Sequence, residues 1–221
     1  MNKIALFDFC ETLANYQTAD AYVRFVMQKR KVGKGLNYWG QLLMERSKLS
    51  AILFRLGINA NKYMLLANLK GLPENMLKEE AKNYYEDVVK PNLVAETICE
   101  LRQKQKEGYK CIIVSGGYDV YLHHFAEEYG IDKVLCTRLR FEDGVFTGGL
   151  WGKDCMGHEK VRMLSREFGS DNLKDIDSIS YSDSQSDMPF LNYTRKAVVV
   201  ARKKAPQWAI QNKFETLLWQ K

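Results

Sequence analysis

The sequence predicts an α/β protein: a Rossmann-like parallel sheet with helices on both faces, an inserted all-helical cap and a small β-hairpin. Short apolar strands alternate with helical stretches over the second half of the chain, a pattern typical of parallel sheets. A first strand, at residues 3–9, stands apart from this alternation and precedes a long stretch of helical periodicity. The 221 residues suffice for one domain with a sizeable insert.

The composition indicates a globular chain and limits the cellular locations and the kinds of partner that we expect. It is 46% hydrophobic and 27% charged, and no apolar run approaches the ~20 residues that span a bilayer. The first strand begins almost at the N-terminus, which leaves no room for a signal peptide, so we expect a cytoplasmic protein without a membrane span. The net charge of +6 is spread over helix ends and turns. Nucleic acid is therefore not expected as a partner, and the sequence does not indicate the oligomeric state.

The helical insert follows the first strand. Apolar residues recur at spacings of three and four from Thr18 to about Lys90, and glycines divide this stretch into roughly four helices. We therefore expect a core of residues 1–15 and 91–221 and a cap of residues 16–90 that closes over it. The apolar stripe with Tyr38, Trp39, Phe54 and Tyr63 is interpreted as the core of the cap itself. Because the segment Leu36–Leu56 is so apolar, a lipid-facing or large-substrate surface is the alternative.

The elements after residue 90 follow from apolar runs and their boundaries. A hairpin is indicated by Asp143–Gly144 between apolar residues, a pair typical of two-residue turns. In chain order the predicted elements are a helix at 93–107, a strand at 110–114, a helix at 119–129, a strand at 134–137, the hairpin within 139–150, a helix at 158–168, and strands at 177–182 and 197–200.

Three predicted strands end at a polar residue: Asp8, Ser115 and Asp183. Because parallel strands end at the same edge of a sheet, we expect these side chains to converge. Asp187, four residues beyond Asp183, can face the same point if the loop curls into a helix. Carboxylates without His or Cys partners favour a hard cation, and Mg²⁺ is the expected cofactor.

An anion site is predicted beside these carboxylates. Ser115–Gly116–Gly117 offers a hydroxyl and unhindered backbone N–H groups before a helix. Lys160 begins a later helix and can bring a cation to the same crevice. A carboxylate surrounded by a metal, a lysine, a hydroxyl and backbone amides is suited to phosphoryl transfer.

These segments resemble a known family. Asp8–Phe9–Cys10–Glu11–Thr12, Ser115–Gly116–Gly117, Lys160 and Asp183–Ser184–Gln185–Ser186–Asp187 resemble, in order, the four motifs of the haloacid dehalogenase-like (HAD) hydrolase superfamily. The helical cap and the hairpin resemble its phosphoserine-phosphatase-like branch. The resemblance implies a phosphatase that hydrolyses a small phosphorylated metabolite.

The resemblance also implies roles for individual residues. Asp8 would be the nucleophile that forms an aspartyl-phosphate, and Mg²⁺ would be held by Asp8, the backbone carbonyl of Cys10 and Asp183, with Asp187 close by or bridging through water. Phosphoryl oxygens would be bound by Ser115, by Lys160 and by backbone amides near Phe9, Cys10 and Gly116.

Cys10 departs from the family pattern, which has an Asp at this position that protonates the leaving group and then activates water. A thiol with an ordinary pKa of ~8.5 is a poor general base at neutral pH, and loss of general acid–base help costs ~10²–10⁴-fold. Glu11 is not expected to replace it, because neighbouring side chains point in opposite directions along an extended backbone. The alternative function is a weakened member that binds a phosphorylated ligand or transfers phosphoryl to an acceptor other than water.

Three further interpretations concern residues outside the four motifs. Gln17 stands where phosphoserine phosphatases carry a Glu for the substrate ammonium, so phosphoserine is not expected as the substrate. His123, His124 and His158 have no metal-spaced partner and are not expected to be catalytic. The cysteines other than Cys10 are interpreted as reduced and structural.

Overall fold

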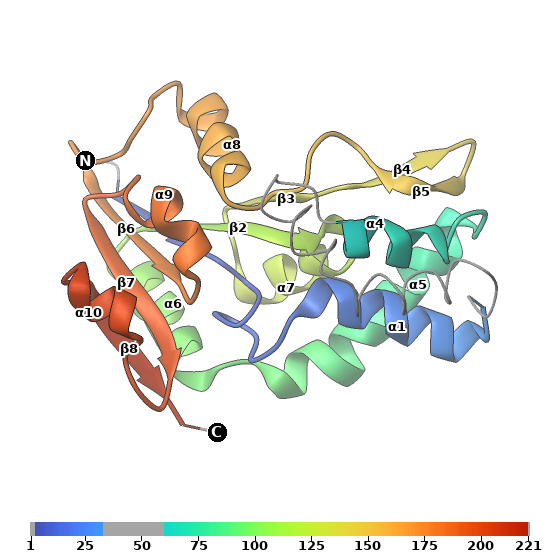
Figure 1. Cartoon of the computed structure of the whole chain (residues 1–221), viewed down its shortest axis with the longest axis horizontal. Coiled ribbons are helices and arrows are strands. Elements are labelled where there is room, and N and C mark those ends of the chain that lie inside the picture. The colour runs from blue at the N-terminus through green and yellow to red at the C-terminus, as the bar shows by residue number, and fades with distance from the viewer. Residues whose placement is uncertain (1–2, 33–59, 221) are drawn as a thin grey trace.

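The computed structural model describes residues 3–32 and 60–220. Its main sheet has six parallel strands in the order β3-β2-β1-β6-β7-β8 (Figure 1). The strands are β1 (Lys3–Phe7), β2 (Lys110–Tyr118), β3 (Lys133–Thr137), β6 (Asp177–Ser182), β7 (Lys196–Arg202) and β8 (Glu215–Trp219). The predicted fold class is confirmed.

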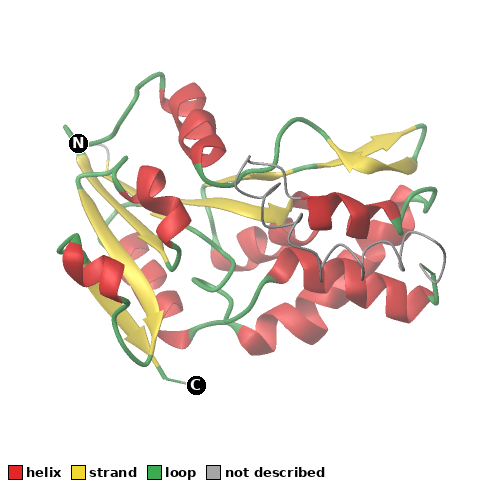
Figure 2. Ribbon diagram, viewed as in Figure 1, coloured by secondary structure: helices red, strands yellow, loops and turns green. Residues whose placement is uncertain are grey.

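Helices cover both faces of this sheet (Figure 2). Alternation along β1 shows the two layers: Ala5 and Phe7 belong to one hydrophobic cluster, whereas Ile4 and Leu6 belong to the other. The first cluster includes side chains from α6 (Ala95–Lys106) and α7 (Asp119–Tyr129). The second includes side chains from α8 (His158–Phe168), α9 (Met188–Leu191) and α10 (Gln207–Gln211). Strands buried on both faces explain the near-continuous apolar runs in the sequence.

The strand ends differ from the predicted ones in ways that shape the site. β1 ends at Phe7, two residues early, and Asp8 makes the last backbone hydrogen bond to β6, from its N–H to the carbonyl oxygen of Tyr181 at 2.9 Å. β2 instead continues through the predicted loop to Tyr118, and its pairing with β3 shifts register between Ser115 and Tyr118. β8 is not predicted from the sequence, because an edge strand with a mostly half-exposed pattern carries little periodic signal.

The described part of the predicted cap is helical, with α1 (Thr18–Arg30), α4 (Ala60–Ala67), α5 (Glu74–Tyr84) and the short turns η1 (Tyr85–Val89) and η2 (Lys90–Asn92). The predicted cap-core residues within Leu36–Leu56 lie outside the described residues, and Tyr63, predicted with them, is 39% exposed and does not belong to a buried core. Tyr22 and Tyr84 share one hydrophobic cluster with Tyr121 of α7. This cluster therefore extends across the predicted boundary between cap and core, and the boundary itself stays a prediction.

The predicted hairpin is present as β4 (Leu139–Glu142) and β5 (Val145–Leu150). Asp143 and Gly144 both have positive φ, 48° and 74°, as a type I′ turn requires. Backbone hydrogen bonds join the hairpin to the loop between α4 and α5: Gly71 N to Phe146 O and Phe146 N to Leu72 O, both 2.9 Å. Figure 1 shows the hairpin lying alongside α4. None of the helices in the described ranges is long and apolar enough to cross a membrane.

Candidate active site

The predicted convergence of strand ends is present. β2, β1 and β6 are neighbours in the sheet, so Asp8 lies between the end of β2, which carries Ser115, and Asp183, which follows β6. A pocket of about 330 Å³ opens at this edge. Of the predicted site residues, it is lined by Asp8, Cys10, Ser115, Gly116, Lys160, Asp183 and Asp187. Phe9 differs, because its ring is buried in the core against Phe125 and it can offer the site only its backbone.

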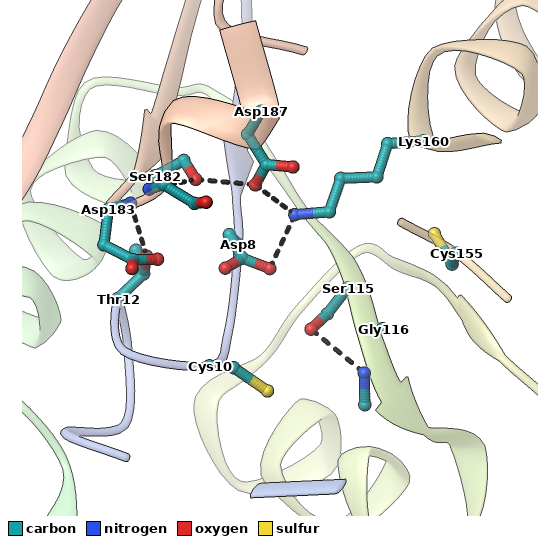
Figure 3. A network of polar contacts seen from close by, with 12 residues as sticks. Asp8, Cys10, Thr12, Ser115, Gly116, Cys155, Lys160, Ser182, Asp183 and Asp187 are labelled. Carbon is teal, nitrogen blue, oxygen red and sulfur yellow. Dashed lines mark hydrogen bonds and ion pairs between the residues drawn. The ribbon is translucent and has the colours of Figure 1, made fainter. Parts of the chain in front are cut away.

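Lys160 connects two carboxylates of the pocket (Figure 3). Its Nζ lies 2.8 Å from Oδ1 of Asp8 and 2.5 Å from Oδ2 of Asp187, and its side chain is 4% exposed. Burial lowers the pKa of Lys160, but the two carboxylates outweigh it and hold this pKa above its usual range. Burial raises the pKa of Asp8, while the lysine opposes this effect. Oδ2 of Asp187, the oxygen that Lys160 contacts, also accepts a hydrogen bond from Ser182. Asp187 therefore lies in the structure as a partner of the lysine.

Asp183 lies on the other side of Asp8. Its Oδ1 accepts a hydrogen bond from Oγ1 of Thr12 at 3.2 Å, and its N–H donates to the same hydroxyl at 3.1 Å. Burial, the charge of Asp8 and that of Glu11 raise the pKa of Asp183 to about 8. The two hydrogen bonds with Thr12 tie the loop after β1 to the loop after β6, against the repulsion between these like charges.

The donor set fits a hard cation. Asp8 and Asp183 offer carboxylate oxygens that repel each other, and the turn at Cys10 can offer a carbonyl oxygen, which matches the preference of Mg²⁺. Within the described residues no group of three His, Cys, Asp or Glu side chains is arranged to hold a metal ion. A cation here would therefore complete its coordination with backbone oxygen, water and substrate, as Mg²⁺ usually does.

The segment 115–117, called the glycine loop below, forms the wall opposite Asp183. Ser115 is fully buried, and its Oγ accepts a hydrogen bond from the N–H of Gly117 at 3.2 Å. A Cβ at residue 116 would lie 2.9 Å from Cγ of Met156, and one at residue 117 would lie 2.6 Å from the Tyr121 hydroxyl oxygen. Position 117 therefore requires glycine, because the buried Tyr121 approaches the backbone closely, whereas a side chain at position 116 would have to displace the partly exposed Met156.

The Cys10 thiol is held by neighbours on the cap side. Its Sγ lies 3.1 Å from Oγ1 of Thr18, which in turn lies 2.7 Å from the hydroxyl of Tyr121. Burial and the negative charge of Asp8 raise the pKa of Cys10. The group that replaces the expected Asp is therefore a protonated thiol at neutral pH.

Glu11 differs from its expected orientation. We expected it to point away from Asp8, but it has a positive φ of 55° and lines the pocket. The prediction assumed an extended backbone, whereas the chain turns directly after β1. Gln17 also lines the pocket and donates a hydrogen bond to Glu11 at 2.5 Å.

Sequence reasoning missed Lys62 and Asp154. Lys62 of α4 lines the pocket, is 3% exposed and lies 2.6 Å from Oδ1 of Asp154. Neither residue belongs to a motif, and they are 92 positions apart. The available signal was a lysine directly before the apolar stretch Tyr63–Leu66. This signal is weak, because lysines often lie at the edge of the apolar face of a helix.

Comparison with known proteins identifies the family. A family model described as haloacid dehalogenase-like hydrolase matches residues 5–192. The chain belongs to the haloacid dehalogenase-like hydrolase family. The predicted family is thereby confirmed, and relatives and solved structures named phosphoserine phosphatase confirm the predicted branch and the prediction of an enzyme.

Relatives of this HAD chain include two proteins named phosphoserine phosphatase. That of Methanocaldococcus jannaschii is 25% identical over 186 residues, which cover 84% of this chain and 79% of the relative. That of Streptococcus thermophilus is 29% identical over 150 residues, which cover 67% of this chain and 64% of the relative.

Solved structures share the HAD fold. A protein of unknown function from Bordetella pertussis Tohama I superposes with a TM-score of 0.79 at 19% identity, covering 98% of each chain. A phospho-aspartyl intermediate analogue of phosphoserine phosphatase superposes with a TM-score of 0.63 at 19% identity, covering 98% of this chain and 93% of that one.

Proposed function

We propose that this protein is a Mg²⁺-dependent phosphatase that hydrolyses a small phosphate monoester through an aspartyl-phosphate on Asp8. The observation that carries this proposal is the position of Asp8: a buried carboxylate that is bound by Lys160 and lines one pocket with the glycine loop, in a member of the HAD family. The division into a core of residues 1–15 and 91–221 and a closing cap of residues 16–90 is part of the same proposal.

In the first step, a carboxylate oxygen of Asp8 attacks phosphorus. A bond from this oxygen to phosphorus forms while the bond from phosphorus to the leaving-group oxygen breaks, and that oxygen takes up a proton. In the second step, water attacks the same phosphorus, loses a proton, and releases phosphate and the Asp8 carboxylate. Covalent catalysis divides one difficult displacement into two easier ones.

The phosphoryl oxygens are proposed to meet donors on two sides. Lys160 supplies an ammonium, Ser115 supplies a hydroxyl, and Gly116, Phe9 and Cys10 supply backbone N–H groups. Because the Ser115 hydroxyl oxygen already accepts from the Gly117 N–H, its own hydrogen is left to donate. Donors that are fixed before reaction contribute most when they face developing negative charge.

Mg²⁺ is proposed to be held by Asp8, the carbonyl of Cys10 and Asp183. When bound, it would offset the negative charge of the carboxylates and the phosphoryl group and act as a Lewis acid. Asp187 is proposed to lie beside this set, close to the ion or bridging through water. Its contacts with Lys160 and Ser182 favour a supporting role.

A second candidate function is favoured by Cys10. A thiol with a raised pKa, hydrogen-bonded to Thr18, offers no base for the water that must attack the aspartyl-phosphate. The protein would then turn over good leaving groups slowly, transfer phosphoryl to another acceptor, or hold a phosphorylated ligand. Added alcohols that divert product from phosphate to a phosphate ester would support the transfer.

The relatives named phosphoserine phosphatase suggest a small phosphorylated substrate. We nevertheless do not expect phosphoserine itself to be preferred. Gln17 carries no charge for a substrate ammonium, and its amide is already bound to Glu11.

The experiment that tests the proposal is phosphate release from an aryl phosphate with and without Mg²⁺, beside Asp8→Asn. An aryl leaving group needs little protonation, so it gives a site without an acid the best chance. Turnover that requires Mg²⁺ and is abolished by Asp8→Asn is the expected result. Equal rates for the wild type and Asp8→Asn would contradict the phosphatase proposal and leave the ligand-binding candidate.

A further inference from the structure

Lys62 is a buried cation on the cap side of the pocket. It lies on α4, its side chain is 3% exposed, and it lines the same pocket as Asp8. Its Nζ donates hydrogen bonds to the carbonyl oxygen of Gly116 and to Oδ1 of Asp154, both at 2.6 Å. The same Nζ lies 5.0 Å from the ring centre of Tyr118. A buried ammonium is stable only where its charge is paired and its N–H groups donate hydrogen bonds. The contacts with Gly116 and Asp154 therefore fix the position of Lys62.

Asp154 anchors this lysine to the core. Its Oδ1 also accepts a hydrogen bond from Oγ1 of Thr137 at 2.6 Å, and that hydroxyl oxygen accepts from the backbone N–H of Cys155 at 3.0 Å. Asp154 and Cys155 precede α8, the helix that carries Lys160. Lys62 thus connects the cap helix α4 both to the glycine loop and to the segment that leads to Lys160.

The Gly116 carbonyl is the point at which Lys62 holds the glycine loop. The peptide between Gly116 and Gly117 carries this carbonyl and the N–H that donates to Ser115 Oγ. Because a peptide is planar, holding its carbonyl also fixes the direction of its N–H. Gly116 and Gly117 lie where the pairing of β2 with β3 shifts register. Glycine has little conformational preference of its own, so this stretch depends on such contacts to keep one conformation.

We propose that Lys62 is a positioning residue for phosphoryl transfer: it holds the glycine loop in the conformation that binds the phosphoryl group and couples that conformation to the cap. This inference rests on the proposed function, because the glycine loop is assigned to the phosphoryl group there. Lys62 itself touches the loop and Asp154, and it acts on the reaction through them.

The test compares Lys62→Met with the double variant Lys62→Met/Asp154→Asn. The single variant leaves the Asp154 carboxylate, whose side chain is 13% exposed, without its counterion and is expected to lower the melting temperature. The double variant removes both charges, which restores most of the stability, but it still lacks the hydrogen bond to Gly116. Lys78→Met is the matched control, since Lys78 is a 60% exposed lysine of α5 paired with Glu74.

The measurements are kcat and KM with an aryl phosphate, and the affinity for orthovanadate and inorganic phosphate by calorimetry with Mg²⁺ present. We expect the double variant to lose about 10-fold or more in kcat and in orthovanadate affinity, with a smaller change in KM, because loop donors act on transition-state charge. A purely structural role would change the melting temperature and leave these values unchanged. Orthovanadate affinity and kcat equal to those of the wild type would therefore overturn the proposal.

If Lys62→Met/Asp154→Asn does not fold, a second double variant takes its place in the test. Lys62→Gln/Asp154→Asn keeps two amides that can bond to each other, but the shorter side chain does not reach Gly116. Loss of folding in both double variants would overturn the proposal, because Lys62 would then be required for folding itself.

Failure of the proposed phosphatase function can be distinguished from failure of the proposed role of Lys62. In that case the wild type and Asp8→Asn would release phosphate at the same rate. Orthovanadate binding does not require turnover, so the effect of Lys62 on the loop would still be measured. A wild type that does not bind orthovanadate would overturn both proposals.

Discussion

Lys160 and Asp8 form an ion pair that is almost completely shielded from solvent. Nζ of Lys160 lies 2.8 Å from Oδ1 of Asp8, and the side chains are 4% and 7% exposed. The same ammonium contacts Asp187 at 2.5 Å, so two buried carboxylates share one cation. This lysine therefore stabilises the site electrostatically before any substrate is bound.

Lys160→Met is expected to abolish phosphate release and to destabilise the protein. Removing one partner of a buried pair costs about 3–5 kcal/mol, because the remaining charge is left buried without compensation. Asp8→Asn leaves the lysine with Asp187 and should cost less. Urea unfolding of both variants measures the difference, and equal stability of Lys160→Met and wild type would contradict this electrostatic role.

Cys10→Asp is expected to increase hydrolysis. It supplies the acid and base that the buried thiol does not provide, and such groups contribute ~10²–10⁴-fold. The gain should be largest for alkyl phosphates, whose leaving groups need a proton, and smaller for aryl phosphates. Cys10→Ser is the matched control, since it changes the side chain without adding a carboxylate. Equal rates for Cys10→Asp and Cys10→Ser on alkyl phosphates would argue against acid–base catalysis at this position.

Mg²⁺ is expected to raise the melting temperature through Asp8 and Asp183. A ligand at 100 times its dissociation constant stabilises the folded state by about 2.7 kcal/mol, which shifts the melting temperature by roughly 5–10 °C in a chain of this length. Asp183→Asn should remove this shift. Asp171→Asn, at an exposed position, should keep it. A shift that is unchanged in Asp183→Asn would place the cation elsewhere.

Glu80 is expected to make the stability depend on pH. Burial alone would raise the pKa of Glu80, but the hydrogen bond from Asn83 and the charges of Lys29 and Arg30 outweigh it and lower the pKa. Because the folded-state pKa is below the unfolded value, the stabilisation is present above the unfolded pKa and is lost as the pH falls through the folded pKa.

Glu80→Gln should therefore cost about 2 kcal/mol at pH 7, as expected for hydrogen bonds to a charged group, and the cost should shrink as the pH falls below 4.5. Urea unfolding at several pH values measures it. Glu79→Gln is the control, because Glu79 is 68% exposed and contacts the same Arg30, and exposed pairs contribute ~0–1 kcal/mol. A cost for Glu80→Gln that is constant with pH would contradict this linkage.

Much of the fold could be predicted because its signals are local. The turn at Asp143–Gly144 follows from the ease with which these residues adopt positive φ. The ends of α7 and α8 follow from Gly130 and Gly169, which adopt the left-handed conformation there. β8 could not be predicted in the same way, because it is defined by pairing with β7.

The sequence by itself determined that Asp8, Ser115 and Asp183 meet, because parallel strands end at one edge of a sheet. Only the tertiary structure decided what surrounds them. The turn after β1 brings Glu11 into the pocket, and Thr18 binds the Cys10 thiol and meets Tyr121 from 103 positions away. Lys62 likewise reaches Gly116 across 54 positions. Strand periodicity is a property of neighbouring residues, whereas contacts between cap and core depend on how separate elements pack, and no local pattern encodes that packing.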